Sequence, residues 1–434
     1  MQSGIPRVSE AVQRFAFDPL LAAFAFAFAI ASASALLFLF DRWGGYFGNV
    51  VSPASHKLAA LEGLRGVLAF SVVMHHAYCW YFFTQYGVWT TGNSVIFARL
   101  ADFGVIQFFY LSGFLFWRKL MKTGRIPVAK FYLSRFVRIG PVYYFCVGAA
   151  IFLGFSLTGL KLQVSIETLA SSLLPWFLFS LGGQTEVNHA DIARITCGVT
   201  WTLALEWLFY LSLPFLGWFS RNARRLLHYA LAFGLLFLLG RYFRAGSPNE
   251  GLLHSASSIL AEYSKFMLVG FGGGILIAAL EPQLRSRLQR LLPWRNWILL
   301  GLYLAYLLVP GIATAGQALV LAGFALVAQG ADLFGLLGSR AIRLLGVFSY
   351  PMYLVHGIVY YSAMRLRGGI HAVSLRAYLG ETAVCVAIIV LLAAIIHLLL
   401  ERPTMRLSER IARRALVPQA IEPEQGLAQE SSSR

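Results

Sequence analysis

The segment "LRGVLAFSVVMHHAYCW" (residues 64–80) decides the fold, because it is apolar enough to cross a bilayer and yet contains Arg65, His75 and His76. Hydrophobic residues make up 58% of the 434 residues, charged residues make up 13%, and the mean hydropathy is +0.67. Further apolar runs follow up to residue 400. These features predict an all-α, polytopic transmembrane helix bundle whose intramembrane ionisable groups face its interior.

Apolar windows of spanning length predict eleven transmembrane helices. We expect them near residues 20–40, 58–83, 101–118, 139–160, 200–219, 226–243, 258–280, 296–312, 314–330, 345–363 and 379–400. The first helix is too long for a signal peptide, so we interpret residues 1–57 as an uncleaved accessory helix with its linker. A membrane core (58–400) follows, and then a largely disordered cytoplasmic tail (401–434).

The shorter run 165–182 decides the topology, and it is interrupted by Pro175. If it does not cross, 24 of the 36 Lys and Arg residues fall on one side of the membrane and 9 on the other. The positive-inside rule makes the rich side cytoplasmic, together with the C-terminus, and residues 161–199 become one extracytoplasmic loop with an interfacial or re-entrant piece. The net charge of +17 then reflects cytoplasmic loops, so no nucleic-acid partner is predicted.

Arg65 and His76 lie on one face of their predicted helix, because eleven residues overshoot three turns by only about 20°. Their separation along the axis is roughly 16 Å. His75 lies about 100° round the helix, so only one of the two histidines points squarely into the same cavity. The structural alternative is an arginine that reaches the headgroups and a histidine that hydrogen-bonds a neighbouring helix.

Arg135 and Arg138 occur in "SRFVRIGPVY" (residues 134–143), at the cytoplasmic end of a predicted span. Residues three apart are neighbours on a helix, so the two guanidinium groups can converge on one anion such as a phosphate. The alternative is that they serve topology or bind anionic lipid.

The segment "TWTLALEWLFYL" (residues 200–211) places Thr202, Glu206 and Tyr210 at every fourth position. A carboxylate inside the bilayer needs a partner or a proton, which Arg65 or an imidazole can supply. Glu206 is alternatively a structural ion-pair anchor, and Trp201 an aromatic-belt residue at the outer boundary.

A last polar stripe runs through "FSYPMYLVHGIVYY" (residues 348–361), where Ser349, Tyr353 and His356 share one helix face. His356 is alternatively a core histidine bonded to another helix. Cys79 is a conceivable nucleophile, although a small packed residue is favoured. The four cysteines show no paired spacing, so neither a disulfide framework nor a metal site is predicted.

Five motifs occur in one order along most of the chain: "LEGLRGVLAFSVVMHHA", "GVIQFFYLSGFLF", "SRFVRIGPVY", "WTLALEWLFYL" and "SYPMYLVH". In these motifs the chain resembles the acyltransferase-3 family of integral membrane O-acyltransferases. The resemblance implies a ten-helix core over residues 58–400, preceded here by one extra helix. It also implies that Arg65, His76, Arg135 and Arg138 are essential.

The resemblance further implies transfer of an acyl group, which we expect to be acetyl, from cytoplasmic acyl-CoA to a hydroxyl of a glycan, glycolipid or lipid-linked sugar. Arg135 and Arg138 would bind the phosphates of the donor, and His76 would act as the general base. The alternative is an acyl intermediate bound to the histidine. Arg65 would stabilise negative charge or hold the pantetheine arm. Glu206 completes the expected catalytic group, and the expected substrate contacts are Ser112, Trp201, Tyr353 and His356. We expect a location in the bacterial inner membrane, no metal, and no particular oligomeric state.

A proton-coupled transporter is the rival interpretation, with His76, Glu206 and His356 as its relay. The sequence shows no convincing internal repeat, which counts against transporters built from inverted repeats. The transporter interpretation also does not predict the pair of arginines, Arg135 and Arg138, at the cytoplasmic end of a span.

Overall fold

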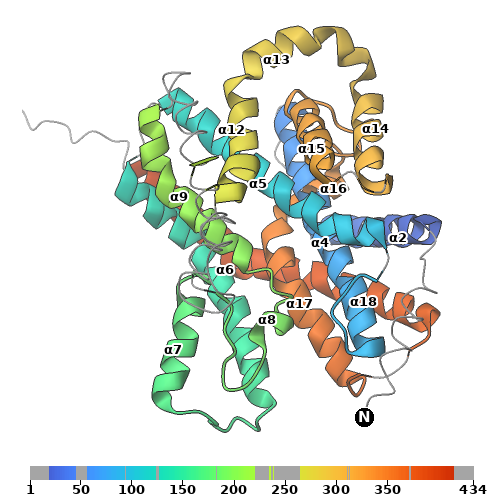
Figure 1. The fold of residues 1–434 in the computed structure, drawn as a ribbon, viewed down its shortest axis with the longest axis vertical. Coiled ribbons are helices and arrows are strands. Elements are labelled where there is room, and N and C mark those ends of the chain that lie inside the picture. The colour runs from blue at the N-terminus through green and yellow to red at the C-terminus, as the bar shows by residue number, and fades with distance from the viewer. Residues whose placement is uncertain are drawn as a thin grey trace, which may run out of the picture.

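The computed structural model describes residues 19–44, 56–92, 94–123, 127–181, 183–219, 264–309, 313–370 and 373–414, together with a few isolated positions. Within these ranges the chain forms helices and no β-strand (Figure 1). The all-α prediction is therefore confirmed. Most of the predicted helix 226–243 and the start of the predicted helix 258–280 lie outside the described residues.

The first half of the chain forms long helices that overlap the predicted spans, although α6 begins eleven residues before the predicted start at residue 139. They are α2 (Pro19–Gly44), α4 (His56–Tyr86), α5 (Val95–Thr123), α6 (Val128–Ser156) and α9 (Trp201–Phe219). Three of them, α4, α5 and α6, have 29 to 31 residues each. At 1.5 Å per residue each is longer than the roughly 30 Å hydrocarbon core of a bilayer.

The second half of the chain contains more breaks. Its elements are η1 (Phe266–Phe271), α12 (Gly272–Ala279), α13 (Glu281–Leu288), η2 (Gln289–Trp294), α14 (Arg295–Leu308), α15 (Ala313–Ala328), α16 (Arg340–Val347), α17 (Ser349–Leu366), α18 (Leu375–Ile396), η3 (His397–Glu401) and α19 (Arg402–Arg414). The chain bends by 67° at α13 and by 71° between α16 and α17. Figure 1 shows α13 as an arch that joins α12 to α14.

The described helices include four that are long and apolar enough to cross a membrane, or six if each bent pair is one span. Shorter apolar helices occupy three more predicted positions, within α2, α14 and α15. The chain is thus an integral membrane helix bundle.

The run that decided the predicted topology forms α7 (Ile166–Phe177), which lies beside α6 (Figure 1). Ser165 caps its N-terminus by accepting a hydrogen bond from the backbone N–H of Thr168. Twelve residues span about 18 Å, which is too short for the hydrocarbon core. This length fits the interpretation that the segment does not cross.

Helix α4 is the central element, because it packs on α5, α16 and α17. Near Arg65 it meets α16 almost backbone to backbone: a Cβ added at Gly346 would lie 2.0 Å from the carbonyl oxygen of Glu62. The Arg343 guanidinium also forms an ion pair with Glu62 at 2.8 Å. Small residues at helix interfaces permit this close approach, which holds the first half of α4 firmly in place.

The accessory helix α2 presents two different faces. Ala29, Ala33 and Leu37 are buried at four-residue spacing where α2 packs on α16 and α18. Phe28 and Phe38 on its other side are exposed, as expected for a helix that faces lipid.

Candidate active site in two adjoining cavities

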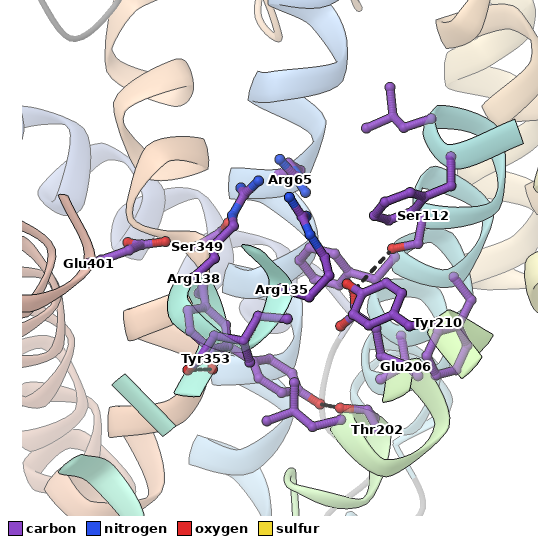
Figure 2. Close-up of a pocket in the computed structure, with 18 of the residues that line it drawn as sticks. Arg65, Ser112, Arg135, Arg138, Thr202, Glu206, Tyr210, Ser349, Tyr353 and Glu401 are labelled. Atoms are coloured by element: carbon purple, nitrogen blue, oxygen red, sulfur yellow. Dashed lines mark hydrogen bonds between the residues drawn. The ribbon is translucent and has the colours of Figure 1, made fainter. Parts of the chain in front are cut away.

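A cavity of about 300 Å³ lies among α4, α5, α6, α9 and α17 (Figure 2). Figure 2 shows three arginine side chains that converge in it, from α4 and α6. The basic lining residues are Arg65, Lys119, Arg135 and Arg138, and the acidic ones are Glu206 and Glu401. We call this space the arginine cavity. With twice as many basic as acidic groups, it is suited to an anionic ligand.

Two of these arginines have buried atoms that the protein leaves unsatisfied. Within the described part of the chain, Nε of Arg65 and Nε of Arg135 have no hydrogen-bond partner. The Arg135 guanidinium instead lies over aromatic rings, 5.5 Å from the centroid of Phe116. Buried polar groups in proteins are normally paired, so a ligand with acceptor oxygens fits this cavity.

Glu206 is held inside the arginine cavity by neighbouring hydroxyls. Its Oε1 accepts hydrogen bonds from Tyr210 and from the Ser112 hydroxyl, the latter at 3.4 Å (Figure 2). The four-residue spacing of Glu206 and Tyr210 thus places them in contact on α9. Glu401 at the cavity edge accepts from His397 Nδ1 at 2.7 Å.

A second cavity of about 290 Å³ begins where the first ends. Its polar and aromatic lining includes His75, His76, Asp102, Trp201, Lys265 and Gln317. We call it the histidine cavity. Trp201 is 39% exposed and packs against Phe266, with ring centroids 5.2 Å apart.

Val105 and Tyr353 line both cavities, so the two spaces adjoin. The Tyr353 hydroxyl lies 2.9 Å from Thr202 Oγ1 and donates to the carbonyl oxygen of Val199 at 3.2 Å. Helix α4 runs past both spaces and supplies Arg65 to one and His76 to the other. Two residues that lie eleven apart in the sequence therefore line two different cavities.

Most of the predicted site residues line one of these cavities. Arg65, Ser112, Arg135, Arg138 and Glu206 line the arginine cavity, His76 and Trp201 line the histidine cavity, and Tyr353 lines both.

Glu206 does not share a cavity with Trp201. Five residues on a helix correspond to about 140° of rotation and 7.5 Å of rise, which places the two side chains on different faces.

His356 was expected to contact the substrate. This residue is fully buried and lines neither cavity. Its place is the interface of α17 with α4, where it contacts His76. The alternative interpretation as a histidine bonded to a neighbouring helix describes its position.

Several lining residues were missed by the sequence interpretation, namely Asp102, Lys119, Lys265, Gln317 and Glu401. Asp102 and Lys265 carried a usable signal, because each is an ionisable residue within a predicted apolar span. Gln317 and Glu401 lie far from the motifs in sequence, and only the packing of α15 and η3 brings them to the cavities.

One grouping within the described residues has the spacing of a metal site. Ligand-type atoms of His76, Cys197 and His356 all lie within 4.8 Å of one another. Two of these atoms are already hydrogen-bonded to each other, and Cys197 Sγ accepts from the indole N–H of Trp80 at 3.1 Å. A hydrogen bond thus accounts for the proximity of the two histidines, while Cys197 is bonded to Trp80.

The fold and the cavities together define a helical membrane protein with a basic cavity next to a buried imidazole. An acyltransferase domain model of the acyltransferase-3 family matches residues 58–398. The chain therefore belongs to this family and is a membrane acyltransferase, as the motifs predicted. No curated protein and no solved structure gives a significant match.

Proposed function

We propose that this protein transfers an acetyl group from acetyl-CoA, bound in the arginine cavity, to a sugar hydroxyl held in the histidine cavity. The acceptor is a glycan, a glycolipid or a lipid-linked sugar. The observation that carries the proposal is the junction at Tyr353, where a cationic cavity meets one that contains a buried imidazole. The distribution of Lys and Arg favours a cytoplasmic arginine cavity and C-terminus in a bacterial inner membrane.

We assign the acyl donor to the arginine cavity because of the charge of its lining residues. The phosphates of coenzyme A suit Arg135 and Arg138, whose planar guanidinium groups can each donate two parallel hydrogen bonds. Arg65 lines the same cavity, about 16 Å along α4 from His76. We therefore assign Arg65 to the path of the pantetheine arm, and the unsatisfied Nε atoms of Arg65 and Arg135 support a polar ligand there.

The chemical step needs a base, because an alcohol is a weak nucleophile until its proton is removed. His76 takes the proton of the acceptor hydroxyl while the oxygen attacks the thioester carbonyl carbon. The resulting tetrahedral intermediate collapses, the carbon–sulfur bond breaks, and the thiolate of coenzyme A takes the proton from His76. When the oxyanion forms, the Tyr353 hydroxyl would turn its single proton from the Val199 carbonyl oxygen to the oxyanion.

The lining of the histidine cavity suits a sugar acceptor. Asp102, Lys265 and Gln317 offer a carboxylate, an ammonium and an amide, while Trp201 adds an aromatic face. A few polar groups among aromatic side chains are typical of small-molecule sites, in which the polar groups fix the orientation of the ligand.

The transporter interpretation loses support from the same geometry. Its relay needs Glu206 next to the two histidines, but Glu206 lies in the arginine cavity and accepts from Ser112 and Tyr210. The relay as expected from the sequence is therefore not assembled.

The test is acetyl-CoA binding and hydrolysis by detergent-purified protein. We expect Arg138→Ala to weaken binding, and His76→Ala to bind normally but to turn over about 10²- to 10⁴-fold more slowly. Lys130→Ala is the matched control, because Lys130 is exposed on the same helix as Arg138 and lines neither cavity. Wild-type protein that neither binds nor hydrolyses acetyl-CoA, but takes up a solute in proteoliposomes, would overturn the proposal.

A further inference from the structure

His356 lies directly behind His76. It is fully buried on α17, and its Nε2 is 3.0 Å from Nδ1 of His76. The two imidazole rings are stacked, with centroids 5.0 Å apart and planes inclined by 28°. His356 therefore contacts the proposed base without lining either cavity.

The direction of the hydrogen bonds follows from the partner at the far side of His356. Its Nδ1 lies 3.3 Å from the carbonyl oxygen of Met352, and a carbonyl oxygen can only accept. His356 therefore carries its proton on Nδ1, and in the neutral ring Nε2 has a lone pair. His76 presents its own Nδ1–H to this lone pair and also has a backbone hydrogen bond to Val72 one turn earlier, and this arrangement leaves the lone pair of His76 on Nε2.

The neighbouring His75 provides the contrast. Its Nδ1 donates to the carbonyl oxygen of Phe97 at 2.7 Å, and its Nε2 lies 3.5 Å from Sγ of Cys79. Both nitrogens of His75 thus have partners within the protein. The structure gives a physical reason why the second histidine of the pair, and not the first, has a nitrogen left for a substrate.

We propose that His356 is a positioning residue that fixes His76 in the Nδ1–H tautomer, so that Nε2 is the basic atom. This inference rests on the proposed function for its catalytic meaning. In the reaction, Nε2 of His76 takes the acceptor proton as the new carbon–oxygen bond forms, and returns it to the leaving sulfur. The Nδ1 protons of both rings stay in place, and the His356 lone pair stabilises the transient imidazolium of His76.

Two substitutions at position 356 separate hydrogen bonding from packing. His356→Gln keeps an acceptor oxygen near the position of Nε2, whereas His356→Leu fills similar space without one. We expect His356→Leu to lower the kcat of acetyl-CoA hydrolysis about 10- to 100-fold with an unchanged Kd for acetyl-CoA. His356→Gln should restore most of that loss. Equal losses in both variants, or a kcat within twofold of wild type in His356→Leu, would overturn the proposal.

A spectroscopic readout tests the tautomer independently of activity. Full-length protein labelled with ¹⁵N-histidine in bilayers should show His76 protonated at Nδ1 and not at Nε2. The resonances are assigned by their loss in His76→Gln, and His356→Leu should shift the population away from Nδ1–H. Protonation of His76 at Nε2 in the wild type would overturn the inference.

The two readouts keep the inference and the proposed function apart. If the tautomer is as expected but wild-type protein does not use acetyl-CoA, the proposed function fails and the positioning of His76 stands. Metal analysis of the purified protein tests the alternative that His76, Cys197 and His356 bind a metal ion. One zinc per chain, lost in His356→Leu, would overturn the proposal because a metal ion would occupy the ring nitrogens whose hydrogen bond positions His76.

Discussion

The two cavities have nearly equal volumes, about 300 and 290 Å³, and they share Tyr353, yet their polar groups differ in kind. The arginine cavity has four basic and two acidic side chains. The histidine cavity balances Lys265 against Asp102 and adds two imidazoles. Fixed charges suit the binding of a highly charged donor, while a neutral imidazole suits proton transfer. Under the proposed function, this difference separates donor binding from chemistry along one helix.

The largest effect, on donor binding, is expected from removing the positive charges of Arg135 and Arg138. The double variant Arg135→Ala, Arg138→Ala should raise the Kd for acetyl-CoA by at least about 100-fold, because a hydrogen bond to a charged group contributes about 1.5–3 kcal/mol. Isothermal titration calorimetry measures the change. The Arg135→Lys, Arg138→Lys double variant should fall between this variant and wild type, because it keeps the charge and loses the planar fork. A Kd within twofold of wild type in the alanine variant would show that the donor binds elsewhere.

An intermediate effect should distinguish the carboxylates of the two cavities. Glu206→Gln removes a negative charge from the arginine cavity and should lower the Kd for acetyl-CoA by about three- to tenfold, since repulsion of the phosphates decreases. Asp102→Asn is the matched change in the histidine cavity and should leave this Kd within twofold of wild type. If both variants change donor binding to the same extent, the two cavities are not functionally separate.

The smallest effect, on kcat, is expected at Tyr353, which lines both cavities. Tyr353→Phe keeps the ring that lines both cavities and removes the hydroxyl, so kcat should fall about 2- to 13-fold, as for a single neutral hydrogen bond. The Kd for acetyl-CoA should not change, because the hydroxyl contacts Thr202 and Val199 rather than the arginines. Steady-state hydrolysis with a parallel binding measurement checks both values, and a change confined to Kd would contradict a role in the chemical step.

The sequence by itself determined what depends on one helix at a time. Apolar length identified the spans, and the fixed rotation of 100° per residue aligned Arg65 with His76 and Arg135 with Arg138. The same periodicity aligned Ser349, Tyr353 and His356 on α17. These alignments follow from local backbone geometry, which does not depend on what packs against the helix.

Only the tertiary structure decided where each of these faces points. Glu206 lies with the arginines and apart from Trp201, and His356 supports His76 from behind instead of lining a cavity. His75 has partners because the Phe97 carbonyl approaches from another helix. The physical reason is that the rotation and depth of one helix against another depend on side-chain packing between segments far apart in the chain. No single helical period contains that information.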